Sequence, residues 1–199
     1  TSGEPLHVND ASSRILDRTL KKKGYVKRGE FHYVMPYNMI FRHSDNMAAL
    51  MWQAARNTAP ADADIVFEGG EKPLKAGALA VMTRFVVAIE HKAMPYLGRL
   101  FKADKDKCVS CGMCMVSCPF GAIADKSQLP AFGKNCIGCT ACSFNCPTDA
   151  ISIGVLNGWR VNGAYKFAPP AEGLTKKDVC SYWRGSYVRY FREHGIVLK

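Results

Sequence analysis

The chain has 199 residues, of which 48% are apolar and 22% are charged, and its formal net charge is +10. These fractions exclude a wholly disordered or low-complexity chain, and no uncharged apolar run reaches the roughly 18 residues of a membrane-spanning helix. The basic excess lies in the flanks, because residues 1–107 and 155–199 each carry +5 whereas residues 108–154 are neutral. Such a balance favours an acidic partner, an anionic membrane surface or nucleic acid, or it only keeps the chain soluble.

The first 60 residues predict a helix, a strand and a second helix. The first helix is expected from residue 9 or 10 to about residue 23, where Gly24 can end it. Residues 25–35 alternate β-rich side chains and predict a strand. Ser44 or the residue after it can cap a helix that ends at about residue 57. One strand cannot form a sheet, so the segment is typical of the last part of a doubly wound α/β domain whose earlier units are missing.

Residues 61–103 are predicted to be a linker that contains an apolar helix. The residues expected to break the chain are Pro60, Gly69, Gly70 and Pro73. A helix is expected over about residues 76–92, and its apolar residues cover more than a narrow stripe. This pattern favours a core or interdomain helix over a surface helix for a partner or a membrane interface.

Eight of the nine cysteines lie in two runs of one pattern, C-x2-C-x2-C-x3-C-P. The first run is Cys108, Cys111, Cys114 and Cys118, and the second is Cys136, Cys139, Cys142 and Cys146. The second run follows the first by 28 residues, and residues 119–123 resemble residues 147–151. The segment is therefore an internal duplication.

This spacing is typical of ligands for cubane iron–sulfur clusters, in which each of four irons takes one thiolate. Cysteines at i, i+3 and i+6 can point at three corners of one cube, whereas the fourth cysteine lies too far round and ligates the other cluster. The sequence predicts two [4Fe–4S] clusters, one held by Cys108, Cys111, Cys114 and Cys146, the other by Cys136, Cys139, Cys142 and Cys118. Zinc sites favour paired cysteines, and disulfides need an oxidising compartment. Since thiolates and clusters are sensitive to oxidation, we expect a reducing, cytoplasmic location.

Residues 104–154 resemble the bacterial-type ferredoxin domain with two [4Fe–4S] clusters. The resemblance implies an α+β fold in which a pseudo-two-fold pair of short hairpins and helices surrounds the clusters. The apolar residues expected to pack around them are Val109, Ile123, Ile137 and Ile151. Free ferredoxins of this type are acidic, whereas this segment is formally neutral. Members of the family carry single electrons between redox partners and perform no bond chemistry.

The N-terminal residues carry a second resemblance. Residues 1–4, the end of the first predicted helix and residues 34–38 look like the last third of the flavodoxin-like domain in flavodoxin–ferredoxin fusion proteins. That likeness places beside the ring of FMN the residues Thr1, Ser2, Gly3 and Glu4. The family's phosphate-binding loop has no counterpart in this sequence, so either this chain alone does not bind FMN or the chain is a fragment. The fragment is favoured, with the missing part an N-terminal flavodoxin half or a partner chain.

Residues 155–199 are expected to form a basic helical extension. Residues 159–161 and 164–167 predict a hairpin, and Thr175 can cap a helix that ends at about Glu193. Aromatic residues alternate with arginines in this helix and could stack on single-stranded nucleic acid, but packing on a small domain is favoured. Cys180 is interpreted as a thiol that acts as a small apolar residue.

The sequence thus predicts an α+β protein with parts 1–60, 61–103, 104–154 and 155–199. Its expected function is single-electron transfer through two [4Fe–4S] clusters, joined to FMN if a flavodoxin-like half is complete. No catalytic residue is predicted, so the chain is a redox carrier or at most a component of an oxidoreductase. The alternative is a wiring or structural subunit of a larger complex, and a nucleic-acid binder is not favoured. The redox partners are expected to be acidic.

Overall fold

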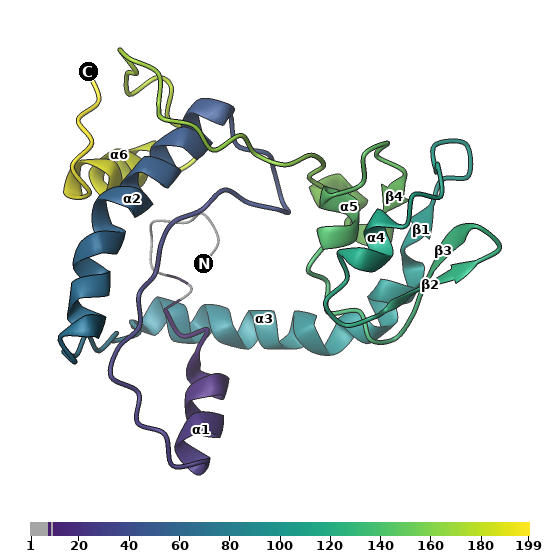
Figure 1. The fold of residues 1–199 in the computed structure, drawn as a ribbon, viewed down its shortest axis with the longest axis horizontal. Coiled ribbons are helices and arrows are strands. Elements are labelled where there is room, and N and C mark those ends of the chain that lie inside the picture. Colours follow the sequence, from purple (N-terminus) through teal and green to yellow (C-terminus); the bar gives the residue numbers. More distant parts are fainter. Residues whose placement is uncertain (1–7, 9) are drawn as a thin grey trace. The chain divides into compact units, whose positions relative to one another are not determined.

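The structure, a computed structural model, describes residue 8 and residues 10–199, and the chain divides into two compact units (Figure 1). The helical unit comprises the described residues up to Pro36, together with His43–Val86 and Lys166–Lys199. The cysteine unit comprises Tyr37–Arg42 and Val87–Tyr165, so it extends beyond the predicted segment 104–154 at both ends. No helix within the described residues has the length and apolar character needed to cross a membrane.

The helical unit is built on α1 (Arg14–Lys22), α2 (Asp45–Phe67) and α6 (Arg184–Glu193). Its core joins the apolar face of α2 to aromatic side chains of α6, through Met47, Leu50, Met51, Tyr187 and Phe191. The three α2 side chains repeat at the spacing of a helix face, which is why they are buried together.

The N-terminus of α2 is the one predicted from the sequence. The side chain of Ser44 accepts a hydrogen bond from the backbone N–H of Met47 at 3.2 Å. The helix does not end near residue 57, and the break expected at Pro60 is wrong. Beyond the proline, the buried carboxylate of Asp62 accepts hydrogen bonds from the Tyr33 hydroxyl (2.8 Å) and from Lys72 Nζ (2.6 Å). These bonds hold the later turns in place despite the interrupted backbone ladder.

The strand predicted over residues 25–35 is not formed. The segment instead makes isolated bridges, such as the parallel bridge between Gly29 and Lys72. The sheets found in the described residues belong to the cysteine unit, so the alternating pattern had no neighbouring strand to pair with. The structure therefore does not support a flavodoxin-like unit, and the predicted flavin loop, Thr1–Glu4, lies outside the described residues.

Helix α3 (Ala78–Leu97) runs further than predicted and contains Pro95. Most of its large apolar side chains are exposed, which contradicts the core alternative of the favoured interpretation; they include Leu79, Met82, Phe85, Val86 and Ile89. The interdomain alternative stays a prediction, since the helix begins in the helical unit and continues into the cysteine unit after Val86. Buried exceptions are Ala80 and Met94.

The C-terminal elements begin later than the sequence predicted. Helix α6 starts at Arg184, not at Thr175, because Trp183 adopts a left-handed φ of 60° that a helix interior does not tolerate. Thr175 instead donates its hydroxyl to the Asp178 carboxylate at 2.9 Å. The predicted hairpin over residues 159–167 is also wrong, since its first residue ends the 3₁₀ helix η2 (Gly154–Trp159). Cys180 is partly buried against the core of the helical unit, as interpreted.

The cysteine unit consists of short elements, in keeping with the expected α+β fold. They are η1 (Gly98–Leu100), β1 (Lys102–Ala103), α4 (Met113–Val116), β2 (Ile123–Lys126), β3 (Leu129–Phe132), α5 (Ala141–Phe144), β4 (Ile151–Ser152) and η2. Strand β1 pairs antiparallel with β4, and β2 pairs antiparallel with β3. Two of the four residues expected inside, Val109 and Ile137, are exposed, whereas Ile151 is buried.

Candidate iron–sulfur sites

The two cysteine runs fold into the same local structure. Each run begins with a loop that holds its first two cysteines and continues into a four-residue helix that holds the third. Helix α5 follows α4 by 28 residues, which is the period of the sequence duplication. The repeat in the amino-acid sequence is therefore also a repeat in the structure.

The two loops share their left-handed backbone positions. In the first loop these are Ser110 (φ 53°) and Gly112 (φ 72°), and in the second Gly138 (φ 74°) and Thr140 (φ 55°). Ser110 corresponds to Gly138, and Gly112 to Thr140, at the 28-residue period. Each loop thus places glycine at one of the two positions that favour it and a polar residue at the other. This explains why the glycines of the two runs do not align in sequence.

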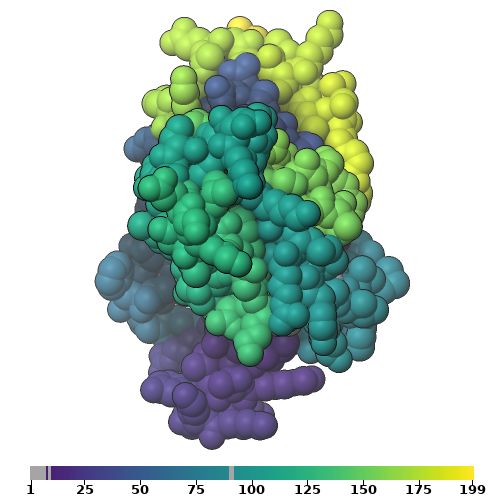
Figure 2. Space-filling model, turned by 90° about the vertical axis from the view of Figure 1, so that its right-hand side faces the viewer, coloured from purple at the N-terminus to yellow at the C-terminus, as the bar shows by residue number. Residues whose placement is uncertain are grey.

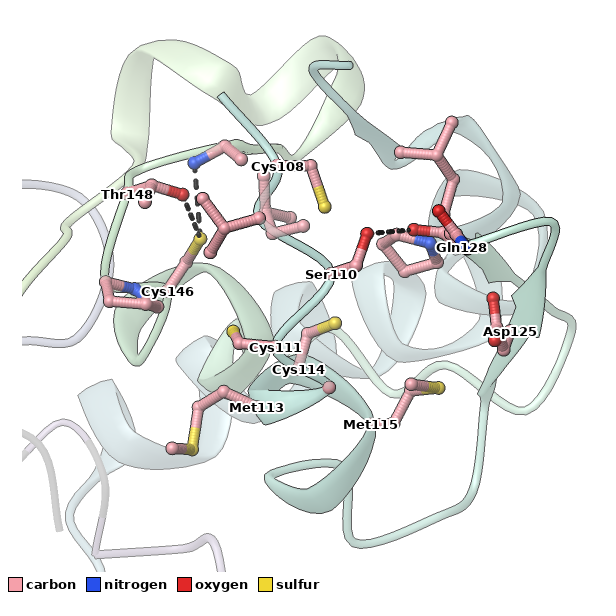
Figure 3. Close-up of a pocket in the computed structure, with 17 residues that line it drawn as sticks. Cys108, Ser110, Cys111, Met113, Cys114, Met115, Asp125, Gln128, Cys146 and Thr148 are labelled. Atoms are coloured by element: carbon pink, nitrogen blue, oxygen red, sulfur yellow. Dashed lines mark hydrogen bonds between the residues drawn. The ribbon is translucent and has the colours of Figure 1, made fainter. Parts of the chain in front are cut away.

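The first cavity has a volume of about 330 Å³, and its lining includes the thiols of Cys108, Cys111, Cys114 and Cys146. Figure 3 shows these side chains around the loop, with Gln128 and Asp125 of the β2–β3 hairpin on the right and Cys146 on the left. Ser110 Oγ donates to the carbonyl of Gln128 at 2.6 Å and so ties the loop to that hairpin. Cys111 is exposed. The structure therefore brings together the first predicted ligand set in an open cavity.

The second cavity is much narrower, about 20 Å³, and its cysteines are Cys118, Cys136, Cys139 and Cys142. Cys142 is buried, and the aromatic rings of Phe101 and Phe132 also line the cavity. The second predicted ligand set is thus brought together as well. Ligation by either set stays a prediction.

Backbone N–H groups approach two of the sulfurs at equivalent positions of the repeats. Ala122 donates to Cys118 Sγ at 3.3 Å, and Ala150 donates to Cys146 Sγ at 3.2 Å. Burial alone would raise the pKa of Cys146, but hydrogen bonds from the backbone of Ala150 and Thr148 outweigh it and lower the pKa. The fourth cysteine of the second run is therefore prepared to carry negative charge.

The other affected thiols are shifted in the opposite direction. Burial, with a smaller contribution from the nearby sulfurs of Cys136 and Cys139, raises the pKa of Cys142 to about 12. Burial also raises the pKa of Cys114, with Cys108 and Cys146 adding to the effect. Grouped thiols resist simultaneous ionisation, so these sites need a cation to hold them as thiolates.

The donor set fits iron–sulfur clusters. Soft thiolates select iron–sulfur clusters, zinc or copper(I). Nowhere in the described residues do three His, Cys, Asp or Glu side chains group closely enough for one metal ion. A cubane spreads its four irons over four corners, so its ligands need not converge on a point. At the first site the cavity also provides space for a cluster. At the second site the cavity is small, so the fit to a cluster rests on the four cysteine sulfurs alone.

Sequence reasoning missed the residues that support the second site from outside the runs. Asn38 Nδ2 donates to the carbonyl of Cys139 at 2.9 Å, and Thr140 Oγ1 donates to the carbonyl of Asn38 at 3.2 Å. Gly98 lies so close to Cys136 that an added Cβ would stand 2.2 Å from its Cβ. These contacts join residues far apart in the sequence, and no local pattern signals them.

A family model described as the 4Fe-4S binding domain matches residues 101–124. The match covers the first cysteine run, Cys108–Cys118, together with strand β1 and the start of β2. No curated protein and no solved structure matches the chain. The chain therefore carries a 4Fe-4S binding segment, and the flavodoxin-like resemblance gains no support.

Proposed function

We propose that this protein is an electron carrier that transfers single electrons through two [4Fe–4S] clusters. The observation that carries the proposal is the arrangement of eight cysteines around two cavities, four at each. The matched 4Fe-4S binding segment supports the first site. The identical spacing, helix placement and left-handed backbone positions of the second run support the second.

A [4Fe–4S] cluster accepts and donates one electron at a time. The task of the protein residues is to hold the cluster and set its potential. The N–H groups of Ala122 and Ala150 donate to ligand sulfurs, which stabilises added negative charge and raises the potential. Phe101 and Phe132 exclude water from the second site, and this exclusion lowers the reduction potential of a cluster there.

The charge of the chain supports an acidic redox partner, because lysine and arginine outnumber aspartate and glutamate by 27 to 17. FMN is not part of the proposal. The residues predicted to lie beside it, Thr1–Glu4, are outside the described residues. A flavin measurement on the native protein remains the direct test of that prediction.

The proposal is tested by iron and sulfide analysis of the anaerobically purified protein, followed by EPR of the reduced form. Two clusters require about eight irons per chain. Cys111→Ala should lower the count toward four, whereas Cys180→Ala should leave it unchanged, since Cys180 lies outside both runs. A wild-type count of four would leave a single cluster, and an iron-free protein would contradict the proposal. Stable EPR-visible reduction followed by reoxidation by a one-electron acceptor separates a carrier from a structural subunit.

A further inference from the structure

The two candidate sites differ in how much of their surroundings is open to solvent. At the first site Cys111 is exposed, and so are the side chains of Val109 (63%) and Val116 (84%). The residues at the same places in the second repeat are better covered, because Ile137 is 36% exposed and Phe144 is half-buried. Figure 2 shows one face of the cysteine unit, whose teal and green residues face the viewer.

The first cover of the second site is the segment Tyr37–Arg42. Its residue Asn38 exchanges hydrogen bonds with the loop at Cys139 and Thr140, as described above. The N–H of Ile40 donates to the carbonyl of Trp159 at 2.7 Å, so the segment is fixed on both sides. It forms a strap over the loop that holds the second ligand set.

The second cover is the segment Arg160–Tyr165. Asn162 Nδ2 donates to the carbonyls of Ser143 (2.7 Å) and Cys146 (2.9 Å), and the N–H of Gly163 donates to the carbonyl of Phe144 (2.9 Å). These bonds satisfy carbonyls at the C-terminal end of α5. The ring of Tyr165 packs near that of Phe144, with centroids 6.0 Å apart.

The two covers are joined to each other. The Arg42 guanidinium donates to the carbonyls of Asn162 and Ala164, both at 3.2 Å, and lies 4.5 Å from the centroid of the Tyr165 ring. Tyr165 in turn donates its hydroxyl to the carbonyl of Tyr37 at 2.8 Å. A layer of backbone and aromatic side chains therefore covers the loop at Cys139 and Thr140 and the C-terminal end of α5.

We propose that electrons enter and leave the protein at the first site, and that the second site exchanges electrons with the first site and not directly with a partner. This inference rests on the proposed two-cluster function. Electron transfer rates fall steeply with distance, so a partner exchanges electrons with the centre it can approach most closely. The strap and the segment Arg160–Tyr165 keep a partner away from the Cys139 loop and from α5, where Cys142 is buried, while Cys111 in the loop of Cys108–Cys114 is exposed.

The test uses charge variants at matched positions of the repeat. Val109 and Ile137 each follow the first cysteine of a run. The reductant is the methyl viologen radical cation, which gives up one electron to become the dication while the protein gains that electron; no bond or proton is transferred. In anaerobic stopped-flow experiments at low salt, Val109→Lys should slow reduction about two- to fourfold and Val109→Glu should accelerate it by a similar factor. Both effects should disappear at about 1 M salt.

Ile137→Lys is the matched control, and its effect on the rate should be less than half that of Val109→Lys. An equal or larger effect of Ile137→Lys would overturn the inference. Iron content is measured on every variant beforehand. If the wild-type protein holds no clusters, the proposed function fails; if it holds both and the two lysine variants slow reduction equally, only this inference fails.

A second measurement needs no electron transfer. Hydrogen–deuterium exchange of the wild-type holoprotein compares amides 109–117 with the matched amides 137–145. The bonds from Asn38, Asn162 and Gly163 end on carbonyl oxygens of the second segment, so they act on exchange only by opposing the local opening that exposes its amides. Those amides should therefore exchange more slowly, by about tenfold, than those of the first segment. Equal exchange of the two segments would show that the covers do not hold, and would overturn the inference even if a lysine variant fails to fold.

Discussion

The contact between Gly98 and Cys136 gives the strictest test of the second site. A methyl group added at Gly98 would place its Cβ 2.2 Å from Cys136 Cβ and 2.7 Å from Cys136 Sγ. The opposing atoms belong to a short side chain beside the backbone, so they cannot swing away. Gly98→Ala must therefore displace either Cys136 or the backbone of η1. Overpacking of a close contact typically costs about 1–3 kcal/mol.

We expect Gly98→Ala to lower the free energy of unfolding by that amount in a urea titration. We also expect the anaerobically reconstituted variant to lose iron toward the content of one cluster, because Cys136 leaves its predicted ligand position. Gly158→Ala is the matched control in the same unit, since no atom lies within 4 Å of its added Cβ. A Gly98→Ala protein that equals this control in both stability and iron content would refute the reasoning.

Three further predictions concern single side chains. Ser44→Ala removes the acceptor at the start of α2 and should lower the free energy of unfolding by about 1 kcal/mol in a urea titration, whereas Ser44→Asp should not. Asn162→Ala removes one of the two hydrogen bonds that the carbonyls of Ser143 and Cys146 each accept, and the two lost bonds should together cost about 1–3 kcal/mol in the same assay. Burial lowers the pKa of His43 to about 4, so stability should fall as pH drops from about 6.5 to 4, because only the unfolded chain binds the proton there. An equally steep fall in His43→Phe would contradict this assignment.

The cysteine pattern predicted the local structure of the candidate sites well, because the ligand spacing and the backbone are tightly linked. Three cysteines three residues apart require a tight loop followed by a helical turn, and both repeats have it. The sequence could not show that Ser110 and Thr140 take the left-handed positions that glycine takes in the other repeat. A search for aligned glycines would therefore have missed the equivalence of the two loops.

The predictions failed where long-range contacts decide the local structure. Residues 25–35 have the alternation of a strand, but within the described part of the chain they make isolated bridges, such as the one to Lys72, and no ladder. Pro60 ordinarily ends a helix, yet the bonds that Tyr33 and Lys72 make to Asp62 hold α2 together beyond it. In both cases the deciding partner lies ten or more residues away, where periodicity carries no information.

The asymmetry between the sites arises in the same way. The two repeats have the same cysteine spacing, so sequence alone gives no reason to distinguish their roles. The difference comes from Tyr37–Arg42 and Arg160–Tyr165, which the sequence had assigned to parts outside the cluster domain and which the structure places in the cysteine unit. A duplicated domain folds both halves alike, and added segments can then cover one half and leave the other accessible. Of two cluster sites with the same ligand pattern, one would then exchange electrons with a partner and the other would not. The cysteine motif alone does not encode this difference.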